Sequence, residues 1–286
     1  MPKLMVECCD GPAELLDRAR PLLQGQPVRH NLILSILERR LLEPLPGRYW
    51  VASREGRCVG MAMQSPLHMP ALLTRMPAPA AAALAEEIAS SSAGSVPGVI
   101  AEAATAAAFA GQWSEATGAA VTPEEGARLY RLARLTPPPA PGGRLRLATE
   151  ADLPVLLEWW RAFSIETGAE GEGPAEQAVA RNLHSQRLFV WEDDGPRSMC
   201  GATPAIAGVS RIGAVYTPSQ SRRRGYAAAA VASLCQRLRR QDGARPILYT
   251  QLANPTSNRI YRRLGFRAVA EVTRYRFGAP GPAPGP

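Results

Sequence analysis

The stretch from Ser210 to Ala232 combines a short apolar segment, a cationic turn and the start of a helix. Residues Ile212 to Thr217 are apolar and β-prone over the length of one strand. Pro218 ends that strand, because proline has no N–H to give to a neighbouring strand. An arginine-rich turn follows, and an alanine-rich helix with apolar residues at helical spacing is predicted from Ala227.

The residue types of this turn suit an anion. Free N–H groups at the start of a helix point outward, and the helix dipole favours negative charge there. Gly225 lets the backbone approach the anion closely, and Arg222, Arg223 and Arg224 add positive charge. The turn therefore predicts a phosphate cradle. The alternative is that Gly225 ends an ordinary turn and that the arginines form a solvated face.

A second group of capping and turn residues lies downstream. The capping and turn residues predict a short helix: Asn254 or Thr256 as its cap, Pro255 near its first turn and Gly265 at its end. Asn258 and Tyr261 are three residues apart and share one face of that helix.

Together the two segments resemble the Gcn5-related N-acetyltransferase (GNAT) family. The acetyl-CoA signature of that family is a Q/R-x-x-G-x-G/A turn, matched here by Arg222-x-x-Gly225-x-Ala227. An Asn-rich helix that ends in Tyr-x-x-x-Gly-Phe follows one strand later, matched by Tyr261 to Phe266. The resemblance covers about the last half of the chain. One departure is Arg223, which stands where many members carry a second glycine.

The resemblance implies an acetyl-CoA-dependent N-acetyltransferase that transfers the acetyl group directly to a primary amine in a ternary complex. The pantetheine arm would pair with the backbone of Val215 and Thr217, whose other role is sheet pairing. The diphosphate would lie on the amides from Arg222 to Ala227, including that of Tyr226. Asn258 would bond the cofactor arm or act as a cap, and Asn254 would shape the turn beside the cofactor.

The transfer needs an acid for the departing thiolate and a base for the incoming ammonium. Tyr261 corresponds to the family's general acid, because a phenol of pKa ~10 is protonated at neutral pH; packing between helix and sheet is its other role. The candidate bases are Glu166, Glu170 and Glu172, with Glu166 as our choice. A solvated acidic loop is the alternative, although such a loop would still suit a cationic amine.

A second class of function stays open, namely a non-catalytic acyl-CoA-binding module that regulates or docks a partner. Tyr261 and Asn258 favour catalysis, whereas the uncertain base favours the alternative. The acceptor, a small-molecule or a peptide amine, is not identified by the sequence.

Composition narrows the class of protein. The chain has 286 residues, 46% of them hydrophobic and 20% charged, which suits a buried core in a soluble protein. No apolar run approaches the ~20 residues of a membrane span, and the first residues do not resemble a signal peptide, so we expect no membrane partner and a cytoplasmic location. Five scattered cysteines and three isolated histidines predict neither disulfides nor a metal site.

The formal charge is +8, and nearly all the excess is arginine. An excess of positive charge is one sign of a protein that binds nucleic acid. The arginines gather around the two motifs, where CoA, itself a polyanion, would use them, and interleaved aromatic residues for stacking bases are missing. Nucleic acid is therefore not the expected partner. A homodimer is left open.

The order of predicted elements repeats in the two halves. We expect a degenerate GNAT-like domain without a CoA motif at 1–135, a Pro/Gly linker at 136–143, a catalytic GNAT domain at 144–277 and a disordered tail at 278–286. The expected fold class is α/β (α+β), with a mixed, mostly antiparallel central sheet flanked by helices in each domain. The last strands are predicted as a pair between Phe266 and Phe277.

Overall fold

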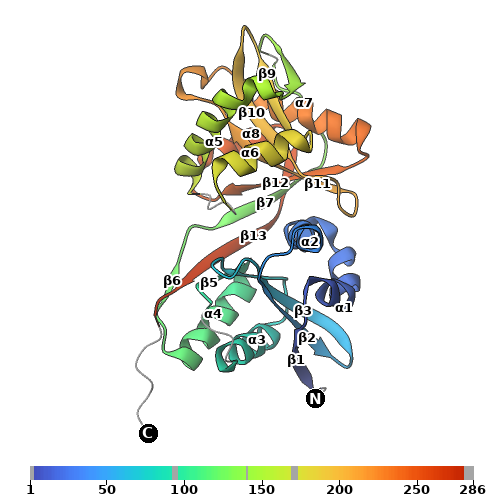
Figure 1. The fold of residues 1–286 in the computed structure, drawn as a ribbon, viewed down its shortest axis with the longest axis vertical. Helices are drawn as coiled ribbons and strands as arrows, with labels where there is room; N and C mark the ends of the chain where they lie inside the picture. Colours follow the sequence, from blue (N-terminus) through green and yellow to red (C-terminus); the bar gives the residue numbers. More distant parts are fainter. Residues whose placement is uncertain (1–2, 92–95, 140, 169–172, 280–286) are drawn as a thin grey trace. The chain divides into compact units, whose positions relative to one another are not determined.

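The structure of the protein is a computed structural model that describes residues 3–91, 96–139, 141–168 and 173–279. The chain divides into two compact units (Figure 1): unit 1 runs up to Arg128 and resumes at Ala270, and unit 2 is Leu129–Val269. Both are α/β units built around a mostly antiparallel sheet, as the sequence predicts. Within the described ranges, no helix has the length and apolar character needed to cross a membrane.

Within its described residues, unit 1 contains four helices and most of its own sheet. Its strands are β1 (Leu4–Cys9), β2 (Arg48–Arg54), β3 (Arg57–Gln64), β4 (Ala71–Leu73), β5 (Gly98–Glu102) and β6 (Val121–Pro123). Its helices are α1 (Pro12–Gly25), α2 (Pro27–Leu42), α3 (Ala78–Ser90) and α4 (Ala103–Thr117). The strand order is β1-β2-β3-β4-β5, followed by the later part of β13 (Phe266–Phe277), which also pairs with β6. Only the β4–β5 pair is parallel among these.

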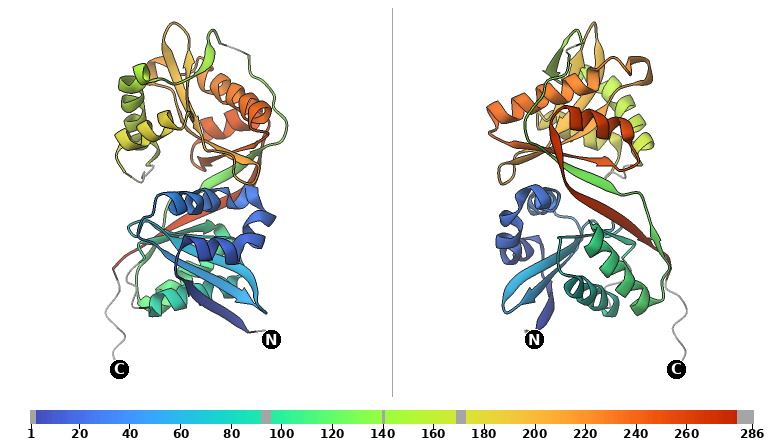
Figure 2. Two further views of the ribbon diagram at one scale, coloured as in Figure 1. Left: turned by 45° about the vertical axis from the view of Figure 1, so that its right-hand side comes forward. Right: turned by 180° about the vertical axis from the view of Figure 1, so that it is seen from behind.

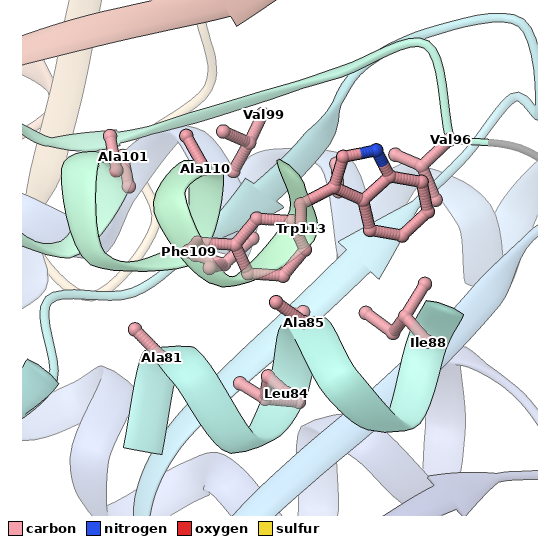
Figure 3. Close-up of a cluster of buried hydrophobic side chains, with 14 of the residues drawn as sticks. Ala81, Leu84, Ala85, Ile88, Val96, Val99, Ala101, Phe109, Ala110 and Trp113 are labelled. Atoms are coloured by element: carbon pink, nitrogen blue, oxygen red, sulfur yellow. The ribbon is translucent and has the colours of Figure 1, made fainter. Parts of the chain in front are cut away.

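The core of unit 1 depends on small residues in its two alanine-rich helices. Alanines allow α3 and α4 to pack closely, and Leu84 and Ile88 of α3 face the rings of Phe109 and Trp113 of α4 (Figure 3). Phe277 of β13 stacks on Trp113 with 5.1 Å between ring centroids. The last strand of the chain is therefore part of this core.

Unit 2 has the same general plan. Its strands are β7 (Ala127–Leu132), β8 (Arg144–Leu147), β9 (Leu188–Glu192), β10 (Pro196–Ala202), β11 (Val209–Tyr216), β12 (Arg245–Gln251) and the start of β13. Its helices are α5 (Leu153–Thr167), α6 (Ala175–His184), α7 (Tyr226–Gln241) and α8 (Pro255–Arg263). The strand order is β8-β9-β10-β11-β12-β7-β13, and β11 and β12 run parallel.

The strands of the two units repeat one order. In unit 1, strands β1 to β5 are followed by the later part of β13 and then by β6. In unit 2, strands β8 to β12 are followed by the end of β7 and then by the start of β13. Unit 2 receives the end of β7 from the first half, and unit 1 receives the later part of β13 from the second half. Only unit 1 is discontinuous in sequence, since unit 2 is the single stretch Leu129–Val269.

This exchange changes the expected boundaries. The predicted strand pair between Phe266 and Phe277 is wrong: β13 is one continuous strand, since the segment has no residues that favour a turn. The unit boundaries fall at Leu129 and Ala270 rather than at 135 and 144. β1 was not predicted, and most of the predicted tail lies outside the described residues.

The predicted linker is packed on unit 2. The backbone N–H of Thr136 donates to the carbonyl of Leu264 at 3.0 Å. Trp191 Nε1 donates to the carbonyl of Gly142 at 2.9 Å. The proline-rich segment is thus held against the rest of unit 2 by two hydrogen bonds, one from the N–H of Thr136 and one to the carbonyl of Gly142.

A half-buried ion pair joins β8 to the helix start that follows it. Thr149 and Asp152 form a capping box there. Arg146 on β8 donates from Nη1 and Nη2 to the two carboxylate oxygens of Asp152, at 2.7 and 2.8 Å. This pairing holds the pKa of Asp152 below its usual range, and Glu192 accepts a further bond from Arg146 at 3.0 Å.

Replacing Asp152 by Asn removes the charge and leaves the side chain's shape. We expect Asp152→Asn to lower the free energy of unfolding at pH 7 by about 1–3 kcal/mol, the usual worth of a hydrogen bond to a charged group. Because the folded pKa is depressed, the contribution of Asp152 is present above an unfolded pKa of about 4 and is lost as pH falls through the folded value.

Urea unfolding at pH 7, 5 and 3.5 measures this effect. The difference between the variant and the wild-type protein should shrink as the pH falls. Asp194→Asn, an exposed carboxylate on the β9–β10 turn, is the matched control and should change stability by less than about 0.5 kcal/mol. A loss for Asp152→Asn that is the same at pH 7 and pH 3.5 contradicts the assignment.

Candidate functional site

The sheet of unit 2 opens between β11 and β12. Their parallel pairing runs from Val209 opposite Arg245 to Ile212 opposite Leu248 and goes no further. β11 continues to Tyr216 and β12 to Gln251, so the two strands part at their carboxyl ends. In α/β sheets, ligands bind beyond the carboxyl ends of the strands, where neighbouring strands diverge.

A bulge in β11 accounts for the opening. Gly213 lies opposite Gly201 of β10, but Tyr216 lies opposite Met199, so two residues of β11 oppose one residue of β10. Ala214, inside the bulge, has a φ of 49°. A bulge bends a strand and increases its twist, and the left-handed conformation costs an alanine about 1–2 kcal/mol. Sequence analysis missed the bulge, since only the neighbouring Gly213 indicates it.

The turn after β11 leaves a run of backbone amides without acceptors. The N–H of Arg222 donates to the carbonyl of Ser219 at 3.3 Å, and the first helical bond of α7 runs from the N–H of Ala229 to the carbonyl of Gly225 at 3.0 Å. Between these bonds, in a fully described segment, the N–H groups from 223 to 228 have no partner in the chain. The run overlaps the amides predicted for the diphosphate, Arg222 to Ala227, except that the N–H of Arg222 itself is bonded to Ser219.

Two residues of the turn adopt a left-handed backbone. Gly225 has a φ of 87°, and a side-chain β-carbon built there would meet only Pro141 Cδ at 4.0 Å, so the surface is open. Arg223 has a φ of 64°. The strained position of Arg223 is the one where the resembling family often has a second glycine, which adopts this conformation without strain.

The three arginines of the turn differ in their surroundings. Arg222 donates from Nε to the carbonyl of Thr217 at 2.9 Å and from Nη2 to both carboxylate oxygens of Glu166, at 2.6 and 2.8 Å. The bond to Glu166 raises the pKa of Arg222. Arg223 and Arg224 are exposed. Only Arg222 is therefore held in place by the end of α5.

The predicted base, Glu166, is thus paired with a predicted cofactor ligand. It sits in the last turn of α5, where the carbonyl of the next residue, Thr167, accepts a hydrogen bond from Gln251 Nε2 at 2.8 Å. The end of α5 therefore bonds to the end of β12 and to the turn after β11. Glu170 and Glu172 lie outside the described residues.

The short helix α8 begins as predicted. Asn254 Oδ1 accepts the N–H of Ser257 at 2.9 Å and caps the helix. Asn258 is 3% exposed, and its Nδ2 donates to the carbonyls of Gln251 and Asn254 at 2.9 and 2.7 Å. Since both donors of Asn258 are engaged, the geometry favours its structural role over a bond to a cofactor arm.

Asn258 has one more partner that sequence analysis missed. Tyr130 on β7 donates its hydroxyl to Asn258 Oδ1 at 2.8 Å, and both side chains are buried. No local signal could identify Tyr130, because it comes from a strand that we assigned to the first domain. The exchanged strand thus supports the helix that carries Tyr261.

Tyr261 lies on the α7 face of the sheet and is 8% exposed. Its ring packs edge-on against Phe266, with 5.9 Å between centroids. Burial, with smaller contributions from Cys200 and Cys235, raises the pKa of Tyr261. Its phenol therefore keeps its proton well above neutral pH, as a proton donor must.

This topology, with a bulged strand, a split between parallel strands and an open helix start beyond it, is the fold of the GCN5-related N-acetyltransferases. Residues 194–276 match the family model of FR47-like proteins, which spans the split, the turn and α8. No curated protein matches the chain significantly.

Solved structures share the fold over the whole chain. A GNAT-family acetyltransferase from Colwellia psychrerythraea is 12% identical with a TM-score of 0.61, and 96% of this chain covers 99% of it. A GCN5-related N-acetyltransferase from Sphaerobacter thermophilus is 16% identical with a TM-score of 0.61, over 98% and 97% of the two chains. A Drosophila protein is 12% identical with a TM-score of 0.66, over 96% and 98%.

Proposed function

We propose that the protein is an acetyl-CoA-dependent N-acetyltransferase, with unit 2 as its catalytic part and a primary amine as the acceptor. The observation that carries this proposal is the split between β11 and β12 together with the unbonded amides from 223 to 228. These amides would hold the diphosphate of acetyl-CoA. The backbone of Val215 and Thr217 would pair with the pantetheine arm inside the split.

The proton transfers are assigned to two side chains. The phenol of Tyr261 would give its proton to the departing thiolate, and its buried, uncharged state suits that role. The carboxylate of Glu166 would take the proton that the ammonium of the acceptor must lose before its nitrogen attacks. The nitrogen loses a second proton once it is bonded to the acetyl carbon, and the tyrosinate left by the first transfer would take it up. Tyr261 is then restored, and Glu166 gives its proton to solvent, which accounts for the one proton that the reaction releases.

Glu166 must leave Arg222 before it can accept a proton. The diphosphate of acetyl-CoA would compete with Glu166 for the guanidinium of Arg222, because both are anions that pair with this side chain. Binding of acetyl-CoA would then release the base. This order makes cofactor binding precede deprotonation of the acceptor.

One observation favours a second function, a non-catalytic acyl-CoA-binding module that regulates or docks a partner. Both oxygens of Glu166 are engaged by Arg222, and no other base is assigned. A screen of amines for release of free CoA from acetyl-CoA separates the two functions. Turnover of any amine excludes the module.

Binding of acetyl-CoA should raise the melting temperature of the protein. At a concentration of 100 Kd, ligand binding adds about 2.7 kcal/mol, which corresponds to a shift of about 5–10 °C for a unit of this size. Gly225→Glu should abolish the shift, because it places bulk and negative charge among the amides.

Gly208→Glu is the matched control. Gly208 also has a positive φ (71°) and open space around it, and it lies on the loop before β11 rather than at the cradle. It should keep the full shift relative to its own melting temperature. A wild-type protein that shows no shift with acetyl-CoA contradicts the proposal.

Tyr261→Phe should lower kcat by about 10²–10⁴-fold, the usual contribution of a positioned acid. The Kd for acetyl-CoA should change by less than about 3-fold, because the ring and its packing remain. Tyr130→Phe is the control: it removes a buried hydroxyl bond and should lower stability by about 1 kcal/mol with little loss of kcat. Unchanged turnover in Tyr261→Phe would remove Tyr261 from the mechanism.

Glu166→Gln should separate cofactor binding from turnover. It removes the anion that competes for Arg222, so acetyl-CoA should bind several-fold more tightly, while kcat falls because the base is lost. Glu176→Gln on α6, whose carboxylate pairs with Arg161 away from the cradle, should leave both values unchanged. Weaker binding of acetyl-CoA to Glu166→Gln would mean that Glu166 only positions Arg222.

A further inference from the structure

The first turn of α7 has no capping side chain. Gly225 is the residue before the helix, and it has no side chain that could bond to the amides of the first turn. A serine or an aspartate at this position would hold the turn, but it would also occupy an N–H group there. The amides from 223 to 228 are unbonded instead. A contact other than a cap must therefore fix the start of this helix.

Tyr226, the first residue of α7, makes such a contact. It is 5% exposed, and its hydroxyl donates to Asp193 Oδ2 at 2.6 Å. The bond raises the pKa of Tyr226, so the phenol keeps the proton that it donates. Asp193 lies in the turn between β9 and β10. Because β10 is antiparallel to β11, that turn lies at the carboxyl edge of β11, where the turn with the unbonded amides begins.

Asp193 also contacts the linker (136–143). A β-carbon built on Gly142 would lie 2.9 Å from Asp193 Oδ1, so the carboxylate packs directly against the backbone of Gly142. A β-carbon on Gly143 would lie 2.0 Å from the carbonyl oxygen of Glu192, and Gly143 has a φ of 90°. Only glycine allows so close an approach in this conformation. The two glycines therefore bring the linker onto the β9–β10 turn.

The linker passes the unbonded amides on its way to β8. A β-carbon built on Gly225 would lie 4.0 Å from Pro141 Cδ, and in both views of Figure 2 the linker, in green, passes beside α7, in orange. The other end of the linker is fixed by the bond from Thr136 to Leu264. Asp193 thus lies between a fixed linker and the first turn of α7, and it contacts both.

We propose that Asp193 is a positioning residue for the cofactor, which holds the first turn of α7 through the hydroxyl of Tyr226 and so preorganises the amides from 223 to 228 for a diphosphate. This inference rests on the proposed function. By charge alone, a carboxylate near an anion site weakens the binding of the anion. Loss of Asp193 should therefore weaken binding if Asp193 positions the amides, and strengthen binding if only its charge acts.

The first experiment is a double-mutant cycle on the Kd of acetyl-CoA, measured by calorimetry. Asp193→Ala and Tyr226→Phe should each raise the Kd by about 5–20-fold, which is part of the worth of one hydrogen bond to a charged group. The double variant should bind no more weakly than the weaker single variant, because both changes remove the same bond. Tyr130→Phe removes a buried hydroxyl bond at α8. As the control, it should leave the Kd within about 3-fold of the wild-type value.

Asp193→Asn and steady-state kinetics separate positioning from a general loss of stability. Asparagine keeps an oxygen that accepts the hydroxyl of Tyr226, so the Kd should stay within about 3-fold of the wild-type value. In Asp193→Ala the KM for acetyl-CoA should rise while kcat at saturating acetyl-CoA stays unchanged, because Asp193 contacts no reacting atom.

Four results would each overturn the positioning role and leave the proposed function standing. They are an unchanged or lower Kd in Asp193→Ala, losses that multiply in the double variant, an Asp193→Asn variant as weak as Asp193→Ala, and a fall in kcat without a rise in KM. If Asp193→Ala fails to fold, as judged by circular dichroism, Tyr226→Phe keeps the ring and tests the role against Tyr130→Phe.

The third experiment repeats the cycle with inorganic pyrophosphate, which lacks the nucleoside and the thioester and therefore probes the amides alone. The same non-additive loss with pyrophosphate supports the positioning role even if acetyl-CoA fails to bind, a result that would refute the proposed function only. A wild-type protein that binds neither acetyl-CoA nor pyrophosphate overturns both.

Discussion

The parting of β11 and β12 beyond Ile212 and Leu248 is the constraint on which the rest of unit 2 depends. Two parallel strands that separate inside a sheet lose backbone hydrogen bonds, and buried backbone groups must find other partners. The carbonyl of Gln251 finds one in Asn258, and its side chain finds another in Thr167. Hydrogen bonds that involve side chains thus replace the missing strand-to-strand hydrogen bonds at the end of β12.

The same constraint explains where strained residues gather. Ala214 in the bulge and Arg223 in the turn both have positive φ values, although neither is glycine. Such conformations cost free energy and persist only where the surrounding structure fixes them. Both flank the opening, one on the strand that bends away and one in the turn with unbonded amides. The strained residues therefore lie on both sides of the opening.

The parts of the site that could be predicted from the sequence are local. The turn from Arg222 to Ala227 and the cap at Asn254 are each set by residues within a few positions of one another, and the structure has both elements. Helix starts carry such signals because capping residues bond to amides only two or three positions away.

The parts that could not be predicted depend on distant segments. The bond from Tyr130 to Asn258 joins residues from opposite halves of the chain, and it exists because unit 2 begins at Leu129, before the predicted domain boundary. The pairing of Glu166 with Arg222 likewise depends on how α5 lies over the sheet. Periodicity and spacing identify elements, but they do not say which sheet a strand completes.

Amide hydrogen exchange with and without acetyl-CoA tests the central claim most directly, because it reports on individual backbone groups. The account predicts slower exchange on addition of acetyl-CoA in two segments of unit 2, the amides from 223 to 228 and the bulged end of β11 from 214 to 217. Unchanged exchange in both segments, or protection confined to unit 1, would contradict it.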